Sequence, residues 1–288
     1  MPVVAVINRK GGSGKSTLAT HLAAWCARNE RKVMLGDVDR QQSALSWLRR
    51  RAVQPLAQGA EIAGWALDGR SVLRPPAGVN HVVLDTPGGL GGPDLARLVM
   101  QADAILMPLC DSVFDRESAA ECHAELMTLP RVASGRCKVG LVGMRLDART
   151  KAEQTLQAWA TAHGLRWVAG VRATQGYVRC IEQGLTIFDL PAARNEADLA
   201  QWQPVTDWLQ AAWADAARAE LESRVNAKPT AVGVSGRFAD GSQPSKPAAP
   251  RPAPPPLEAP PVRATLQGAP PRGLAGRLGW LLNAFRSN

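Results

Sequence analysis

Short apolar runs alternate with longer segments of helical spacing over most of the chain. The runs are rich in β-branched residues or leucine, as strands are. They cover residues 3–7, 32–37, 81–85, 104–109, 138–144 and 166–171. In the segment after the first run, Leu18, Leu22, Trp25 and Cys26 fall on one helical face. Apolar strands joined by helices predict a three-layer α/β fold with a mainly parallel central sheet, whose ligand sites lie at the carboxyl ends of the strands.

A glycine-rich segment follows the first predicted strand directly. It reads Asn8-Arg9-Lys10-Gly11-Gly12-Ser13-Gly14-Lys15-Ser16-Thr17. Glycines let the backbone turn its N–H groups around an anion, and the start of the next helix adds partial positive charge. The usual G-x-x-x-x-G-K-[ST] spacing would need glycine where Arg9 stands, but the variant K-G-G-x-G-K-[ST] matches, with Lys10 as a second lysine. A plain turn between strand and helix is the alternative, which the strand–loop–helix setting and the two lysines disfavour.

Acidic residues follow two other predicted strands. Asp37 and Asp39 come at the end of the second run, and Asp85 ends the third. Each could cap a helix, but three carboxylates at neighbouring strand ends beside a phosphate loop point to one Mg²⁺ ion and one water. Lys15 would reach the β- and γ-phosphates of a nucleotide, and Ser16 would hold the metal.

With these motifs the chain resembles the ParA/MinD family of deviant Walker ATPases. The resemblance covers nearly all of residues 1–215, and it includes Met107-Pro108, Val171-Arg172 and the stretch from Gly184 to Leu190. It implies a P-loop NTPase fold, ATP and Mg²⁺ as ligands, and an ATP-dependent homodimer. By the same resemblance the catalytic residues are Lys10, Lys15 and Asp39, and the metal residues are Ser16, Asp37 and Asp85. The nucleotide would be bound by Lys10, Gly11, Gly12, Ser13, Gly14, Lys15, Ser16 and Thr17.

The resemblance also suggests individual roles. Lys10 would cross the dimer interface to the partner's nucleotide, Asp39 would orient or activate the attacking water, and Asp85 would be the carboxylate of the switch II segment. One departure concerns the base, because family members often place an adenine-binding Asn where this chain has Met144, followed by Arg145. A thioether cannot replace the amide, so adenine recognition would come from elsewhere.

A set of spaced basic residues near the end of the predicted domain is the candidate DNA surface. It consists of Arg166, Arg172 and Arg179 with the aromatic Tyr177, and Arg172 and Arg179 are the expected contacts. Nonspecific phosphate contacts need only positive charge at intervals. A solvated face with scattered arginines fits the same pattern equally well.

Charge and proline divide the chain into unequal parts. The whole chain of 288 residues has a formal net charge of +9. Residues 1–222 hold 25 basic and 23 acidic side chains, so their net charge is only +2. Residues 223–288 hold 9 basic and 2 acidic side chains and 12 of the 22 prolines. The sequence therefore predicts an ATPase domain at 1–222, a disordered Pro-rich linker at 223–272 and an amphipathic helix at 273–288.

The predicted terminal helix has an apolar face with a basic margin. The face consists of Leu274, Leu278, Trp280, Leu281, Leu282 and Phe285. It could lie on an anionic membrane as the terminal helix of MinD does, dock on a partner protein, or pack on its own domain. Amphipathicity does not choose among these acceptors.

The remaining residue types narrow the class of protein. Five cysteines, odd in number and without a C-x-x-C pair, argue against a disulfide frame, a zinc site or a shared iron–sulfur cluster, and one tyrosine argues against an autophosphorylating kinase. The first residues lack the pattern of a secretory signal, and no run of apolar residues is long enough to span a membrane. We expect a bacterial cytoplasmic protein, associated with the nucleoid or peripherally with the membrane.

Three functions are compatible with these observations. The first is a slow ATPase that dimerises on ATP and positions DNA or another cargo. It would bind DNA nonspecifically, and a ParB-like or other adaptor would stimulate its hydrolysis of ATP. The second is a MinD-like module whose terminal helix binds a membrane or scaffold, with ATP controlling that recruitment. The third, a metabolic ligase or reductase of the same superfamily, would need a small-molecule pocket that the sequence does not reveal.

Overall fold

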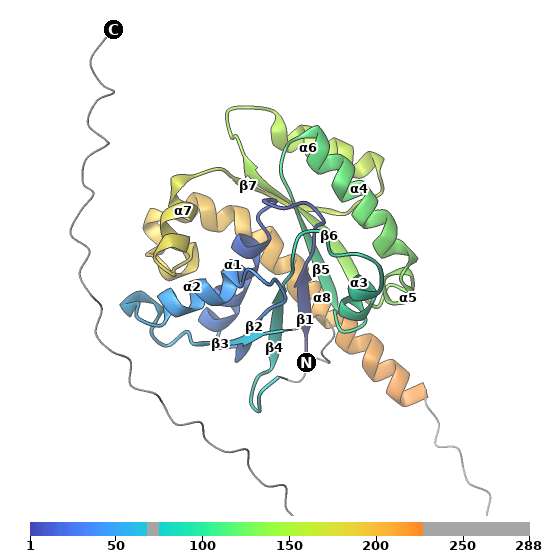
Figure 1. Ribbon diagram of the computed structural model, residues 1–288, viewed down its shortest axis with the longest axis horizontal. Coiled ribbons are helices and arrows are strands. Elements are labelled where there is room, and N and C mark those ends of the chain that lie inside the picture. The colour runs from blue at the N-terminus through green and yellow to red at the C-terminus, as the bar shows by residue number, and fades with distance from the viewer. Residues whose placement is uncertain (68–74, 227–288) are drawn as a thin grey trace, which may run out of the picture. The chain divides into compact units, whose positions relative to one another are not determined.

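The computed structural model describes residues 1–67 and 75–226, and in this part the chain forms one sheet with helices on both faces (Figure 1). The strand order is β3-β2-β4-β1-β5-β6-β7, and every neighbouring pair is parallel. The strands are β1 Val3–Val6, β2 Val33–Asp37, β3 Ile62–Ala66, β4 His81–Asp85, β5 Ala104–Leu109, β6 Lys138–Leu146 and β7 Trp167–Arg172. The predicted mainly parallel sheet is thus entirely parallel in the described residues.

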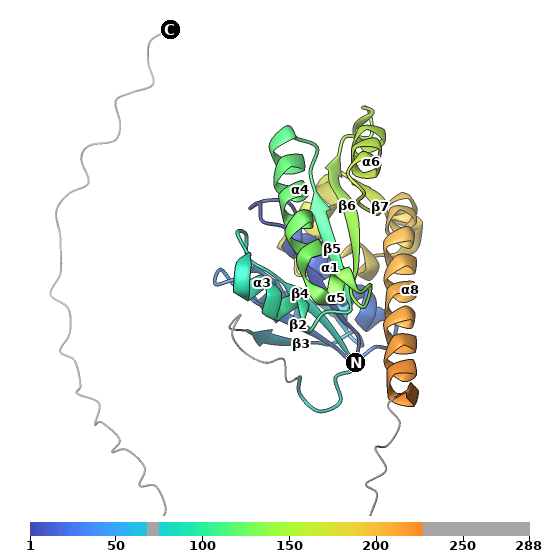
Figure 2. The ribbon, with the colours of Figure 1, turned by 90° about the vertical axis from the view of Figure 1, so that its right-hand side faces the viewer.

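Helices cover both faces of the sheet and complete the three predicted layers (Figure 2). One face carries α1 Lys15–Arg28, α2 Ser43–Arg51, α7 Gln175–Glu182 and α8 Glu196–Asn226. The other carries α3 Gly92–Val99, α4 Val113–Thr128, α5 Pro130–Ala133 and α6 Ala152–Ala162. Three short 3₁₀ turns, η1 Pro55–Ala57, η2 Ile187–Asp189 and η3 Ala192–Arg194, connect elements. The three-layer α/β architecture is confirmed.

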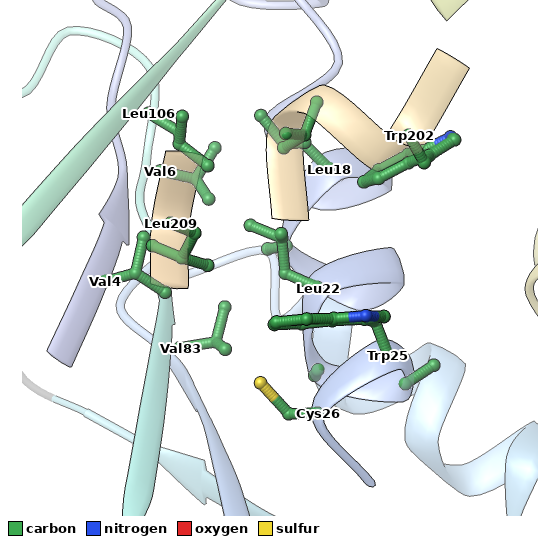
Figure 3. Close-up of a cluster of buried hydrophobic side chains, with 14 of the residues drawn as sticks. Val4, Val6, Leu18, Leu22, Trp25, Cys26, Val83, Leu106, Trp202 and Leu209 are labelled. Carbon is green, nitrogen blue, oxygen red and sulfur yellow. The ribbon is translucent and has the colours of Figure 1, made fainter. Parts of the chain in front are cut away.

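The helix after the phosphate loop packs deep in the molecule. Figure 3 shows Leu18 and Leu22 of α1 beside strand residues such as Val6 and Leu106, and all four are fully buried. Burial of each such side chain contributes about 1.5–3 kcal/mol to folding. The helical face predicted from the spacing of Leu18, Leu22, Trp25 and Cys26 is correct, and it fixes the start of α1 against the sheet.

One strand of the sheet was missed by the sequence pattern. β3 is an edge strand whose residues are mostly half-buried or exposed, so it lacks the apolar run that identifies the inner strands. Gly64 lies in its middle, where an added Cβ would come within 2.8 Å of a Leu48 methyl group of α2. Close helix packing therefore explains a glycine that weakens the strand signal.

The predicted C-terminal parts lie largely outside the described residues. Helix α8 continues to Asn226, past the boundary expected at residue 222. The rest of the predicted linker and the predicted terminal helix, with Leu274, Leu278, Trp280, Leu281, Leu282 and Phe285, are not described, and their predictions stay predictions. Among the described helices, none is long and apolar enough to cross a membrane.

Candidate functional site

The phosphate loop joins β1 to α1 at the carboxyl edge of the sheet. Gly12 and Gly14 adopt left-handed backbone conformations, with φ of 76° and 96°, which side-chain-bearing residues rarely take. Gly14 directly precedes α1, and its carbonyl accepts the Leu18 N–H at 2.9 Å. A glycine-built turn thus places the start of a buried helix at the site.

Two side chains hold the loop from within. Asn8 is fully buried, its Nδ2 donates to the Pro108 carbonyl at 2.7 Å, and its Oδ1 accepts the Lys10 N–H at 3.1 Å. The Lys15 ammonium donates to the Lys10 carbonyl at 2.8 Å. Burial lowers the pKa of Lys15, and the negative charges of Asp85 and Asp39 oppose that effect. The lysine is therefore a buried cation within the field of the predicted carboxylates.

Asp85 is a buried carboxylate with neither oxygen in a hydrogen bond of ordinary geometry. Burial raises its pKa to about 7; the nearby Ser16 hydroxyl and Lys15 lower it, while the charges of Asp37 and Asp39 raise it. Leaving such a group unpaired is unfavourable, so the arrangement fits a cation bound beside Ser16. No group of three or more His, Cys, Asp or Glu side chains in the described ranges is arranged to hold a metal ion. Mg²⁺ often takes only one or two carboxylates together with substrate phosphates.

The other two predicted carboxylates flank Asp85. Asp37 stands opposite Asp85 in the register of β2 and β4, and its two oxygens accept the Asp39 and Leu45 N–H groups, each at 3.1 Å. Asp39 is half-buried and accepts the Gln41 N–H at 2.9 Å. The structure therefore brings Asp37, Asp39 and Asp85 to one edge, but the oxygens of Asp37 already hold the start of α2.

Lys10 lies on the outer side of the loop, against the start of α4. Its ammonium is 3.1 Å from Asp115 and 5.9 Å from the centre of the Phe114 ring. Phe114 is 74% exposed. Sequence reasoning missed Asp115 and Phe114, because the segment reads as an ordinary helix start capped by Ser112.

Arg9 ties the loop to the segment that follows Asp85. Its guanidinium pairs with Glu125 of α4, whose other oxygen accepts the Gly92 N–H at 2.6 Å. The Arg9 carbonyl accepts the Gly89 N–H at 2.6 Å. The residue that breaks the usual glycine spacing therefore clamps the two loops together, a role the spacing alone does not reveal.

Met144 is buried against Gly14 of the phosphate loop. A Cβ at Gly14 would lie 3.4 Å from its terminal methyl group, so the thioether packs against the glycine next to Lys15. The residue that departs from the family pattern thus serves as packing for the phosphate loop.

The candidate DNA residues separate into different environments. Arg172 makes a two-point ion pair with Asp198, with nitrogen–oxygen distances of 2.7 and 3.2 Å. Tyr177 is buried, and its hydroxyl accepts the Trp202 indole N–H at 3.0 Å, so the prediction of a surface aromatic there is wrong. Arg179 is exposed on α7. Of the two expected DNA contacts, Arg179 has the more available charge.

The fold is a parallel sheet between two layers of helices, and its carboxyl edge carries a glycine loop, a buried lysine and an aspartate without a hydrogen-bond partner. These features define a P-loop nucleotide-binding protein. The model of the CobQ/CobB/MinD/ParA nucleotide binding domain matches residues 4–224. The chain belongs to this family, which confirms the resemblance to ParA and MinD.

Relatives extend along most of the domain. Maintenance of carboxysome distribution protein A of Gloeobacter kilaueensis is 32% identical over 214 residues, covering 73% of this chain and 95% of that protein. The chromosome-partitioning ATPase Soj of Thermus thermophilus is 30% identical over 190 residues, covering 56% of this chain and 76% of its own. An ATP complex of a Cyanothece McdA variant is similar in structure, with a TM-score of 0.54 at 14% identity over 74% of this chain and 96% of that one. At that identity the structure supports the fold alone.

Proposed function

We propose that this protein is a Mg²⁺-dependent ATPase that dimerises on ATP and acts as a switch to position DNA or another cargo. The observation that carries the proposal is the pair of lysines on one glycine loop, Lys15 buried and hydrogen-bonded within the loop and Lys10 half-buried and paired with Asp115 of α4. Relatives named for carboxysome distribution and chromosome partitioning, aligned along most of their length, support the positioning role.

The inner residues support nucleotide binding and metal binding. The N–H groups of Gly11 to Thr17 and the Lys15 ammonium would hold the phosphates, and Ser16 and Asp85 would hold the metal. A bound Mg²⁺ would neutralise charge on the phosphates. Asp37 would keep the Asp39 segment in place through its backbone contacts, and Asp39 would orient the attacking water.

The outer residues support dimerisation. Lys15 hydrogen-bonds inside its own loop, whereas Lys10 is half-buried and lies beside the exposed Phe114. A lysine in that position can reach the nucleotide of a second copy and stabilise charge there, as an arginine finger does. Each copy would then be incomplete alone, which makes hydrolysis slow until a partner such as a ParB-like adaptor acts.

Nonspecific DNA is the proposed matrix for the dimer. Arg179 offers an exposed cation and Arg172 a second one at the end of β7, although its charge is paired with Asp198. Two copies in a dimer would double this weak surface, which suits a binding mode governed by phosphate contacts. DNA-stimulated ATPase activity would support this matrix, and lipid-stimulated activity would instead favour the membrane alternative.

The decisive experiment uses Lys10. We expect Lys10→Ala to bind ATP with nearly unchanged affinity but to remain monomeric in light scattering, because the lysine acts on the partner. Asp39→Ala should bind ATP and accumulate as a dimer, because hydrolysis no longer separates it. Lys151→Ala, which removes an exposed lysine at the start of α6, is the matched control. Normal dimerisation of Lys10→Ala would disprove the role of the lysine across the interface.

A further inference from the structure

The end of β6 contains an irregularity beside the phosphate loop. Between two paired positions β6 advances from Gly143 to Leu146, while β7 advances only from Gly170 to Arg172, so β6 has one residue more. Such a bulge re-aims a side chain, and bulges are frequent next to active sites. The side chain re-aimed here belongs to Arg145.

Arg145 has a backbone conformation that arginine rarely adopts. Its φ is 55°, in the left-handed region, which costs on the order of 1 kcal/mol for a residue with a Cβ. Within the described ranges, Glu30 and Gln42 also have positive φ, but both stand at helix ends, whereas Arg145 is inside a strand. Glycine would take this conformation without strain. The contacts of the arginine side chain must therefore offset the backbone strain at this position.

The guanidinium reaches across to the phosphate loop. Its Nη2 donates to the Gly12 carbonyl oxygen at 2.6 Å and lies 3.0 Å from the Cys110 sulfur. That sulfur is 3.8 Å from the Ser13 carbonyl oxygen. Arg145 therefore holds the glycine segment at Gly12, whereas the Lys15 ammonium binds the Lys10 carbonyl.

Peptide geometry gives this contact a consequence for anion binding. The Gly12 carbonyl and the Ser13 N–H belong to one planar trans peptide, so they point in opposite directions. A carbonyl fixed toward Arg145 turns the Ser13 N–H away from it. Gly11 and Gly12 are exposed, and a Cβ on either would meet nothing within 4 Å, so no side chain packs where these Cβ atoms would lie.

We propose that Arg145 is a positioning residue of the nucleotide site, which fixes the Gly12–Ser13 peptide so that the Ser13 N–H is ready to bind a phosphate oxygen. The proposal rests on the proposed nucleotide-binding function of the loop. Under this proposal, a residue of β6 influences the affinity of the loop for the phosphates of the nucleotide. A peptide held in one orientation by this contact has less freedom to lose on binding, so the contact lowers the ordering cost of binding.

The test measures loop order and ligand affinity separately in the full chain. In the nucleotide-free protein labelled with ¹⁵N-serine, we expect Arg145→Met to lower the heteronuclear NOE of the Ser13 amide, because the peptide plane is released. By calorimetry, ADP should bind about tenfold more weakly, the effect of losing roughly 1.4 kcal/mol from a charge-assisted hydrogen bond. Arg145→Lys, which keeps a donor, should stay within about threefold of wild type.

Two further variants separate positioning from folding. Arg149→Met, at an arginine that is 89% exposed in the same connection, should change neither reading. Arg145→Gly relieves the strained φ, so it should keep or raise the Tm while ADP affinity falls. An unchanged Ser13 amide in Arg145→Met would overturn the proposal, as would unchanged ADP affinity. If the wild-type protein itself failed to bind ADP, the proposed function would be disproved. The NOE of the Ser13 amide would still show whether Arg145 restrains the Gly12–Ser13 peptide.

Discussion

Lys10 and Asp115 form an ion pair across 3.1 Å, which joins the phosphate loop to the first turn of α4. The same carboxylate accepts the hydroxyl of Ser112, the residue that caps α4. A lysine that acts on a partner's nucleotide must leave this carboxylate first. If Lys10 acts across a dimer interface as proposed, the pair would favour the monomer by the modest amount expected of a partly exposed ion pair.

Asp115→Asn should make dimerisation easier. The amide can still accept the Ser112 hydroxyl but no longer attracts the Lys10 charge, so the lysine is released. We expect the dimer dissociation constant with a slowly hydrolysed ATP analogue to fall about two- to fivefold, which corresponds to ~0.4–1 kcal/mol. Sedimentation equilibrium measures it, and the gain should shrink at high salt.

Asp111→Asn is the matched control for that variant. Asp111 precedes the same helix and pairs with Arg116 at 2.9 Å, whereas Lys10 pairs with Asp115. It should leave the dimer constant within error. An equal gain from both variants would attribute the effect to net charge and not to the release of Lys10.

Asp85→Asn should stabilise the nucleotide-free protein while removing its response to magnesium. A neutral amide is less unfavourable to bury than a carboxylate without partners. We expect the Tm to rise by about 2–10 °C, and Mg²⁺ no longer to change ADP affinity. Thermal unfolding and calorimetry check these results, with Asp94→Asn, which alters an exposed residue of α3, as control. A lower Tm for Asp85→Asn would contradict the prediction.

The stability difference between Asp85→Asn and wild type should depend on pH. Burial raises the pKa of Asp85 to about 7, and an unfolded aspartate titrates near ~3.9. The folded state binds the proton more tightly, so wild-type stability falls as pH rises from about 4 to about 7.

His21 acts in the opposite direction, because burial lowers its pKa to about 4 and stability is lost as pH falls below ~6.5. It is common to both proteins and cancels in the difference. Urea unfolding should therefore give the largest difference above pH ~7.5 and almost none below pH ~4. A difference that is constant with pH would refute the assignment to Asp85.

Asp189 is a structural carboxylate whose loss should be severe. It is buried and accepts hydrogen bonds from Arg51 at 2.7 and 2.9 Å and from Arg28 at 3.0 Å. Burial would raise its pKa, but these arginines outweigh burial and hold the pKa below its usual value. Asp189→Ala would leave Arg51 buried and unpaired, so we expect a loss of about 3–5 kcal/mol in urea unfolding. Asp207→Ala, at an exposed position of α8, should cost under ~0.5 kcal/mol.

The two candidate DNA arginines should behave differently. Arg179→Ala should weaken binding to a nonspecific duplex a few fold and reduce the salt slope by about 1, because an exposed charge is lost. Arg172→Ala should mainly lower the Tm, because Asp198 is buried and loses its partner. Fluorescence anisotropy at several salt concentrations, together with thermal unfolding, separates the two effects. Equal loss of DNA affinity without a change in Tm would show that both contact DNA.

Local sequence was sufficient for the inner strands of the sheet and for the phosphate loop, but not for the edge strand β3. Inner strands such as β4 and β5 are buried on both faces, so they read as unbroken apolar runs with the bounds that the structure has. The loop depends on glycine at left-handed positions such as Gly12 and Gly14, a requirement that the backbone imposes within a few residues. The carboxyl ends of parallel strands share one edge, so Asp37 and Asp85 were expected at the same edge, and the register of β2 and β4 places them opposite each other.

The surroundings of these residues become visible only in the folded chain. Asp115 lies 3.1 Å from Lys10, and Arg145 lies 2.6 Å from Gly12, across more than a hundred positions of sequence. Such contacts depend on how helices and bulges are placed after the sheet has formed, and no local pattern encodes them. Local patterns predicted the α/β class, the inner strands and the phosphate loop. Long-range packing sets which charges are paired and which peptide is held, because these are properties of neighbours in space.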